Sequence, residues 1–193
     1  MNHYIHDFAH EEWDAKKKHF NLTKQLIPTI RVCRVYAGLL LEDSIGPWFG
    51  FGTKDGIYEA VGSSTRRTSY TSKLDVGKAL AAISCLPLTS IPEEVALHGD
   101  GKSFEEIAEM MEQNGAGSIR MSTIPLAAYK AEVLANPSPT PERYLRFLMG
   151  EGKIDHSDDG LGNQNRAALQ SVVRWKQMAD LAQETGGKPW ADL

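Results

Sequence analysis

Residues 97–108 are Leu97-His98-Gly99-Asp100-Gly101-Lys102-Ser103-Phe104-Glu105-Glu106-Ile107-Ala108. The residues just before and at its start, 95–97, are apolar and predict a short strand. Ser103 and Glu106 have the spacing of a capping box, in which each side chain accepts a hydrogen bond from the other residue's backbone amide at a helix start. The helix is expected to end near Gln113, with Gly115 as its C-terminal glycine. The stretch therefore predicts a strand, a Gly-Asp turn and a helix, which is a unit of a mixed α and β fold.

The same stretch contains the Gly-Lys-Ser sequence of a phosphate-binding loop at Gly101-Lys102-Ser103. That pattern requires a glycine five positions before its second glycine, and the residue there is Ala96. Asp100 would also place a carboxylate beside the phosphates. A Gly-x-Gly-x-x-Gly pattern is absent too, because Asn165 stands where the third glycine after Gly160-Leu161-Gly162 would be. We therefore interpret residues 99–103 as a strand-to-helix turn.

Apolar periodicity and turn residues predict the remaining elements. Strands are expected over residues 29–36, 57–61, 68–71 and 118–122. Helices are expected over residues 7–26, from Ser72 or Asp75 to about Cys85, from Ser122 or Thr123 to before Pro137, over 140–149 and over 170–184. Residues 46–52 are rich in glycine and aromatic side chains and fit no regular element, and residues 155–165 are expected to form a polar loop.

The composition indicates a globular chain. It has 193 residues and 21.3 kDa, with 41% hydrophobic and 24% charged residues, which is typical of soluble domains. A net charge of −4 and a pI near 5.9 disfavour nucleic acid as a partner. The mean hydropathy is −0.35, and no apolar stretch approaches the roughly 18 residues of a membrane span. Because the first residues also lack the features of a signal peptide, we expect a cytoplasmic protein without a membrane partner.

The sequence gives little support for a metal site or a nucleophilic site. Two cysteines, Cys33 and Cys85, are too few for a disulfide framework or a cysteine zinc site. His6 and His10 are four residues apart, as two ligands on one helix face would be, but no third ligand pattern accompanies them. A Gly-x-Ser-x-Gly nucleophile elbow is absent as well. We therefore expect no metal site.

The helix expected over residues 7–26 carries three consecutive lysines. Ala9, Trp13 and Phe20 form one apolar stripe, and Lys16 projects onto that stripe, whereas Lys18 lies on the opposite side. A second apolar stripe runs along the same helix, so we expect the helix to be wedged between other elements. A lysine on a buried stripe either extends its stem to reach water or places its ammonium group in a site.

Three segments, in this order, resemble the NmrA-like and isoflavone-reductase-like proteins, which are atypical short-chain dehydrogenases of the NAD(P)-binding Rossmann superfamily. The segments are Trp13-Asp14-Ala15-Lys16-Lys17, Arg34-Val35-Tyr36-Ala37-Gly38 and Ser69-Tyr70-Thr71-Ser72-Lys73-Leu74-Asp75-Val76-Gly77. Residues 97–108 are similar to the family's strand, Gly-Asp turn and helix, and residues 175–190 look like the ending of fungal members. The resemblance covers essentially the whole sequence, but only the C-terminal portion of the family.

This resemblance implies an α/β fold. We expect the C-terminal part of a Rossmann-like doubly wound sheet plus a small α+β substrate-binding lobe, with the first βαβ units missing. Residues 1–193 would be a single truncated NmrA-like domain, in which residues 1–45 end the nucleotide-binding sheet and residues 46–193 form mainly the substrate-binding lobe. The family's glycine-rich turn, which cradles the pyrophosphate of NADPH at a helix N-terminus, is absent from these residues. We therefore expect NADP to be the family cofactor and to bind weakly here.

The resemblance also implies the site residues. They are Lys16 as the catalytic lysine with Lys17 as the register alternative, Tyr36 and Ala37 beside the nicotinamide, and Trp48, Phe49 and Phe51 along the substrate pocket. Plain core packing is the alternative interpretation of the three aromatic residues. Conventional members place a tyrosine four residues before the lysine, and the corresponding residues here are Glu12 and Trp13.

The function implied is that of an oxidoreductase, NADPH-dependent by ancestry, acting on a hydrophobic small metabolite in fungal secondary metabolism. Two alternatives stay open: a non-catalytic dinucleotide sensor or regulator, and a cofactor-free isomerase or cyclase. Because most strands of a complete sheet are missing, we expect exposed apolar surface on the Trp13 and Phe20 stripe and along residues 30–35. Such surface would favour self-association into a homo-oligomer.

Overall fold

The computed structural model describes residues 8–165 and 174–192. The helices are α1 (Glu11–Leu26), α2 (Leu41–Ser44), α3 (Lys73–Ser84), α4 (Phe104–Gln113), α5 (Leu126–Ala135), α6 (Glu142–Gly150) and α8 (Met178–Glu184), with 3-10 turns η1 (Pro47–Phe49) and η2 (Leu88–Ser90). The strands are β1 (Arg34–Tyr36), β2 (Leu39–Leu40), β3 (Phe51–Gly52), β4 (Ile57–Val61), β5 (Thr68–Thr71), β6 (Glu94–Ala96), β7 (Asp100–Lys102) and β8 (Arg120–Ile124).

The described strands form three small sheets. β1 pairs with β6 in parallel, with Val35 opposite Val95. The second sheet has the order β2-β5-β7, parallel between β2 and β5 and antiparallel between β5 and β7. The third has the order β3-β4-β8, antiparallel and then parallel. The α/β class expected from the sequence is confirmed.

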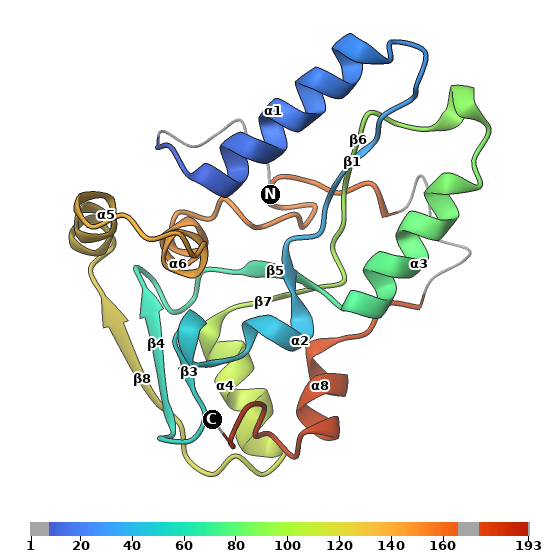
Figure 1. Cartoon of the computed structure of the whole chain (residues 1–193). Coiled ribbons are helices and arrows are strands. Elements are labelled where there is room, and N and C mark those ends of the chain that lie inside the picture. The colour runs from blue at the N-terminus through green and yellow to red at the C-terminus, as the bar shows by residue number, and fades with distance from the viewer. Residues whose placement is uncertain (1–7, 166–173, 193) are drawn as a thin grey trace.

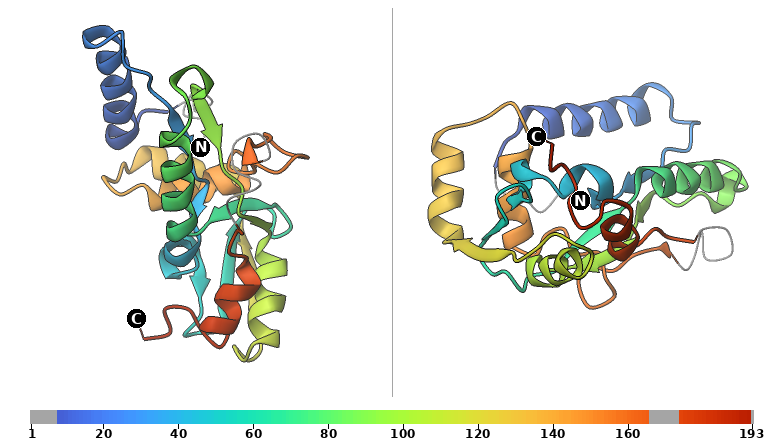
Figure 2. Two further views of the ribbon diagram at one scale, coloured as in Figure 1. Left: turned by 90° about the vertical axis from the view of Figure 1, so that its right-hand side faces the viewer. Right: turned by 90° about the horizontal axis from the view of Figure 1, so that it is seen from below.

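The elements are spread along an elongated molecule. Figure 2 shows α1 at one end and α4 with α8 at the other. In Figure 1, β1 and β6 run side by side beneath α1, with α3 to their right, and α5 and α6 lie above the β3-β4-β8 sheet. Within the described residues, no helix has both the length and the apolar character needed to cross a membrane.

Two clusters of buried side chains hold these elements together. The larger lies between the β3-β4-β8 sheet and the surrounding helices, and its fully buried members include Phe51, Tyr58 and Phe147. The smaller joins α3 to β6 through Ile83 and Val95. The division at residue 45 stays a prediction.

Several local expectations are confirmed. Strands β4 and β5 have the predicted bounds, Ile57–Val61 and Thr68–Thr71. The capping box of α4 forms as expected, because the Ser103 hydroxyl accepts from the Glu106 amide at 3.2 Å and the Glu106 carboxylate accepts from the Ser103 amide at 2.8 Å. Gly115 ends the turn after α4 with φ at 108°, a conformation that favours glycine.

The expectation that the first helix is wedged between other elements is wrong. Of the residues of α1, only Trp13 is buried, and Leu22 and Leu26 are 45% and 68% exposed. In Figure 1, α1 lies along the top of the molecule, and its second half contacts β1 at one side only, where Arg34 lies over the Phe20 ring at 4.1 Å. The expected exposure of the Trp13 ring is wrong too, because it packs edge-on against Tyr144 of α6, with ring centroids 6.0 Å apart.

Helix boundaries differ where charges or prolines decide them. Residues 8–10 are not helical, and α1 begins at Glu11, where three carboxylates in the first turn favour a helix N-terminus. The helix expected from Ser122 or Thr123 begins instead at Leu126. Both of these residues belong to β8, which ends just before Pro125, and residues before a proline favour the extended conformation.

Three further expectations need correction. The helix expected over residues 170–184 begins at Met178; residues 170–173 lie outside the described part, and residues 174–177 are not helical. Residues 46–52 do contain regular structure, since Phe51 pairs with Tyr58. The strand expected over residues 29–36 is only Arg34–Tyr36, because its partner β6 is itself three residues long.

Candidate functional site

A cavity of about 430 Å³ lies where α1, β1, β2, α2, η1 and α6 meet. We call it the main cavity. It is lined by Glu12, Trp13, Lys16, Val35, Tyr36, Ala37, Gly38, Leu39, Leu40, Asp43, Ser44, Phe49, Pro141 and Leu145. Aliphatic and aromatic side chains make up most of this lining, and the polar groups are few, which is the usual composition of a small-molecule pocket.

The chain passes through the cavity wall at Gly38. This residue has φ at 70°, and a Cβ atom there would lie 2.5 Å from the carbonyl oxygen of Ser69 on β5. Only glycine permits both the left-handed backbone and this close approach. Gly38 thus allows the short turn between β1 and β2. β2 is followed directly by α2, and all three elements line the cavity.

Lys16 lies at the mouth of the main cavity. Its ammonium group forms an ion pair with the Glu12 carboxylate one turn earlier on α1, and the lysine side chain is 59% exposed. Trp13, on the same face, is buried beneath it. The exposed ammonium agrees with a lysine that extends its stem to reach water. A role of this ammonium in a site stays a prediction.

Tyr36 lies between the main cavity and a smaller one of about 120 Å³, because its side chain lines both. Glu94 and His156 also line the smaller cavity. Burial, followed by the neighbouring Glu94 carboxylate, raises the pKa of Tyr36, so its hydroxyl stays protonated at neutral pH. The hydroxyl is buried and interacts with the Glu94 carboxylate, on the side of the smaller cavity.

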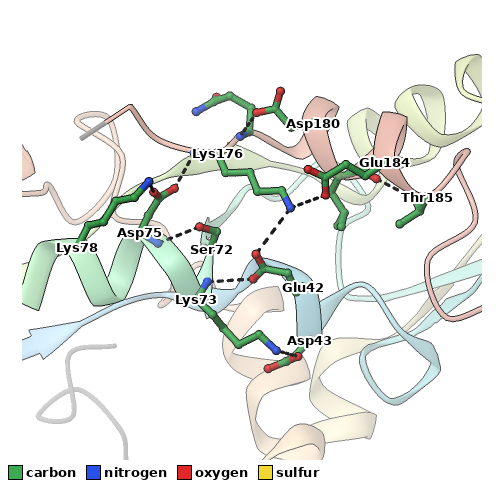
Figure 3. Close-up of polar contacts among 12 residues, drawn as sticks. Glu42, Asp43, Ser72, Lys73, Asp75, Lys78, Lys176, Asp180, Glu184 and Thr185 are labelled. Carbon is green, nitrogen blue, oxygen red and sulfur yellow. Dashed lines mark hydrogen bonds and ion pairs between the residues drawn. The ribbon is translucent and has the colours of Figure 1, made fainter. Parts of the chain in front are cut away.

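The carboxylates of the main cavity each have a lysine partner. Glu12 pairs with Lys16, and Asp43 of α2 pairs with Lys73 of α3, with 2.8 Å between Asp43 Oδ1 and Lys73 Nζ (Figure 3). Close pairing cancels most of the field of these four charges. The arrangement therefore suits an uncharged apolar ligand whose oxygen atom lies near Lys16.

The predicted site residues divide into two groups. Lys16, Tyr36, Ala37 and Phe49 come together in the main cavity, although they belong to three different segments. Lys17 instead lines a surface groove on another side of α1, together with Asp14, Lys18, Asn21, Leu22 and Gln25. We call this the outer groove.

Two predicted substrate residues lie elsewhere. Phe51 is fully buried and stacks on Phe104, with ring centroids 4.2 Å apart, as core packing requires. Trp48 packs against Trp190 and donates its indole N–H to the Asp43 carbonyl at 2.8 Å. Core packing, the alternative interpretation from the sequence, describes Phe51. Trp48 is only half-buried and contacts α2 and the C-terminal segment.

Other lining residues were not singled out from the sequence. Asp43 and Ser44 belong to a four-residue helix without periodicity, and Leu145 of α6 and Pro141, just before α6, come from far along the chain. Gly38 belongs to the segment Arg34–Gly38 that carries the family resemblance, but the sequence of this segment does not reveal the close approach of Gly38 to Ser69. Long-range contacts of this kind leave no local signal.

The N-termini of α3 and α4 do not fit the pyrophosphate of a dinucleotide. Such a group needs free backbone amides at a helix N-terminus next to glycine. At α3, the Ser72 hydroxyl accepts from the Asp75 amide at 3.1 Å and the Glu42 carboxylate accepts from the Lys73 amide at 3.0 Å. At α4, the capping box takes the same position. These two N-termini are therefore closed by the chain's own acceptors.

Metal ligands do not gather in the described part of the chain. There, no three His, Cys, Asp or Glu side chains lie close enough together to hold an ion. Of the histidine pair noted in the sequence, His6 lies outside the described residues.

No protein-family model and no curated protein matches the sequence. Solved structures do match the fold. One is an isoflavone reductase, with 12% identity and a TM-score of 0.71 over 95% of this chain and 62% of the other. A second is a nucleoside-diphosphate-sugar epimerase from Staphylococcus aureus, with 15% identity and a TM-score of 0.60 over 86% of this chain and 57% of the other.

A third similar structure is a monomeric L-threonine 3-dehydrogenase from a metagenome, with 13% identity and a TM-score of 0.54 over 93% of this chain and 55% of the other. The chain thus spans less than two thirds of the length of each of these proteins. At these identities the likeness concerns the fold. The chain has the mixed α/β fold of part of a Rossmann-like reductase or epimerase.

Proposed function

We propose that the chain is the substrate-binding part of an NAD(P)H-dependent oxidoreductase that acts on a hydrophobic small metabolite. The observation that carries the proposal is the meeting of Lys16, Tyr36, Ala37 and Phe49 in one cavity. The similar structures named as a reductase and a dehydrogenase support the oxidoreductase class as a fold-level analogy. NmrA-like kinship, NADP as the cofactor, fungal secondary metabolism and a cytoplasmic location belong to the same proposal.

The residues of the main cavity have distinct parts in this function. The apolar wall around Trp13, Phe49 and Leu145 excludes water and binds the carbon skeleton of the metabolite. Lys16 donates a hydrogen bond to a substrate oxygen at the mouth, where its charge stabilises negative charge that develops on that oxygen. The cavity volume of about 430 Å³ lies within the usual range for small-molecule sites.

We propose the same two parts of the chain that the sequence analysis predicts. Residues 1–45 would supply the end of the nucleotide-binding sheet, and residues 46–193 would supply most of the substrate lobe. Because the helix N-termini of α3 and α4 are closed, the dinucleotide phosphates would be bound by residues other than these.

A second candidate is a cofactor-free isomerase or cyclase that uses the same cavity. The closed N-termini of α3 and α4 favour it, because they remove two positions for a pyrophosphate group. The two candidates share the cavity and differ only in the need for a dinucleotide. Multiple turnovers of a metabolite without NADPH would select the second.

The cavity can be tested with a neutral aromatic ketone, 2-acetylnaphthalene, titrated into the purified protein by calorimetry. We expect a dissociation constant of roughly 0.1 mM, an ordinary affinity for a ligand of this size. Ala37→Leu adds apolar atoms inside the cavity and should weaken binding at least about tenfold, which corresponds to about 1.4 kcal/mol.

The matched control is Ala128→Leu, the same substitution at an exposed position of α5 away from the cavity. It should leave ketone binding unchanged. Equal affinity in wild type and Ala37→Leu would remove the main cavity from the proposal. Lys16→Met should weaken the ketone while Lys18→Met does not, because only Lys16 lines the cavity.

A further inference from the structure

One wall of the main cavity depends on contacts from far along the chain. Asp43 and Ser44, which line the cavity, belong to α2, a helix of only four residues. A helix this short has almost no stability of its own, since its hydrogen bonds barely offset the cost of nucleation. Something outside α2 must therefore hold the wall in place.

Glu42, the neighbouring residue of α2, makes three contacts with two other segments of the chain. Its carboxylate accepts a hydrogen bond from the Lys73 amide at 3.0 Å and lies 3.8 Å from the ammonium of Lys176 (Figure 3). Its backbone carbonyl accepts from the indole N–H of Trp190 at 2.9 Å. Two of the three contacts come from the C-terminal segment, residues 174–192.

This segment is itself anchored by buried carboxylates. Asp75 of α3, 1% exposed, accepts from the Lys176 amide at 2.7 Å, and Asp100 of β7, 7% exposed, accepts from the Met178 amide at 2.8 Å. Hydrogen bonds to buried charged groups are stronger than neutral ones. The ammonium of Lys176 is held between Glu42 and Glu184, at 3.8 and 2.5 Å (Figure 3). The segment is therefore a fixed support from which Lys176 and Trp190 reach α2.

Trp190 shows that this contact has a cost. It is the one non-glycine residue in the described part of the chain with a positive φ, 58°. The left-handed conformation is unfavourable for a side chain as large as tryptophan. Its ring packs on Trp48, with centroids 5.2 Å apart, and Trp48 in turn donates to the Asp43 carbonyl. The strained residue thus contacts α2 directly and through a second tryptophan.

We infer that residues 174–192 act as a clamp that fixes the α2 wall of the main cavity, with Lys176 and Trp190 as positioning residues. Neither residue lines the cavity; both act through Glu42. The inference rests on the proposed function only where it treats the main cavity as the substrate site. It assigns a role to Trp48 as well, whose side chain the sequence had placed in the substrate pocket.

The clamp can be tested by hydrogen–deuterium exchange of the peptide covering residues 39–45. Trp190→Phe keeps an aromatic ring but removes the indole donor, and Lys176→Met keeps the apolar stem but removes the charge. We expect exchange of this peptide to rise about fivefold in Trp190→Phe, the equivalent of one lost hydrogen bond. In both variants the dissociation constant for 2-acetylnaphthalene should rise at least about twofold. The reason is that a smaller fraction of the molecules has α2 in the conformation that binds the ketone.

Trp175→Phe and Lys188→Met are the matched controls. They make the same chemical changes in the same segment. Trp175, however, packs on the smaller buried cluster between α3 and β6, and Lys188 is exposed. Unchanged exchange of residues 39–45 in both clamp variants overturns the inference, as does an equal rise in the controls. If the ketone fails to bind wild type, the proposed function fails, and the exchange result still decides the clamp.

Discussion

Gly38 is the residue at which the wall of the main cavity comes closest to another strand. Gly38→Ala should lower the free energy of unfolding by at least about 2 kcal/mol, because it combines left-handed strain with a clash against Ser69. Gly117 has φ at 84° with nothing near its Cβ position, so Gly117→Ala carries the strain without the clash. Urea denaturation of both variants separates the two effects. Equal losses would mean that the close approach at Gly38 relaxes freely.

His156 makes the stability depend on pH. Burial lowers its pKa to about 4, and its Nδ1 lies 3.0 Å from the Leu97 carbonyl. Between pH 6.5 and about 4 the unfolded chain binds a proton that the folded one does not, so the free energy of unfolding falls as the pH falls. In His156→Asn this fall between pH 6 and 5 should be smaller by about 1 kcal/mol, measured by denaturant titration. An unchanged pH dependence would contradict the burial of a neutral imidazole.

The sequence singled out some residues that line the main cavity because their signals are local, and their roles stay predictions. Lys16 stood out by its place on an apolar stripe of one helix, and the structure places it at the cavity mouth. Phe51 and Trp48 could not be placed in this way, because an aromatic residue beside glycines suits a pocket and a core equally well. Only the rings of Phe104 and Trp190, distant in the chain, decide between them.

Among the elements, α3 contains a position that can be improved. Gly77 lies exposed within this helix, and a Cβ atom there would meet nothing within 4 Å. Gly77→Ala should raise the free energy of unfolding by about 0.5–1 kcal/mol, because alanine loses less backbone entropy on entering a helix. A thermal melt compares the variant with wild type. A loss of stability would mean that Gly77 is needed for a contact in a larger assembly.

Element boundaries were predictable where a capping box or a short β-branched run decides them. The capping box at Ser103 and the strand at Ile57–Val61 depend on residues within a few positions. The start of α8 at Met178 depends only partly on such nearby residues, because Gln177 and Asp180 form a capping box there. The distant carboxylates of Asp75 and Asp100 also accept from the Lys176 and Met178 amides, and this part was not predictable. The exposure of α1 was not predictable either, since its apolar stripes are shared by buried and solvent-facing helices.

At the scale of the whole molecule, the fold matches only part of each similar solved structure. Residues 1–193 contain no glycine-rich pyrophosphate turn, and the N-termini of α3 and α4 are closed. We therefore expect NADPH to bind this chain with a dissociation constant weaker than about 1 mM, since phosphate contacts supply much of the anchoring. Calorimetry is the measurement. Micromolar affinity would show that phosphate contacts arise elsewhere in the chain.

Self-association is a second property of the whole molecule and stays a prediction. The structure exposes Leu26, Ile27 and Ile30 by 68%, 45% and 50% at the end of α1 and in the segment that follows. Trp13, which the sequence analysis expected to be part of the exposed apolar surface, is buried. A fold made of three small sheets was not predictable from residue patterns, because each strand is only two to five residues long.

The most direct test of the main cavity as the substrate site is an amide chemical-shift map of the protein with 2-acetylnaphthalene. We expect shifts at Trp13 and Lys16 on α1, across residues 35–44, and at Leu145 of α6, because these positions surround the cavity. The outer groove, with Asp14 and Asn21, should stay unchanged. Shifts that gather along the outer groove, or that leave residues 35–44 unaffected, would contradict the account.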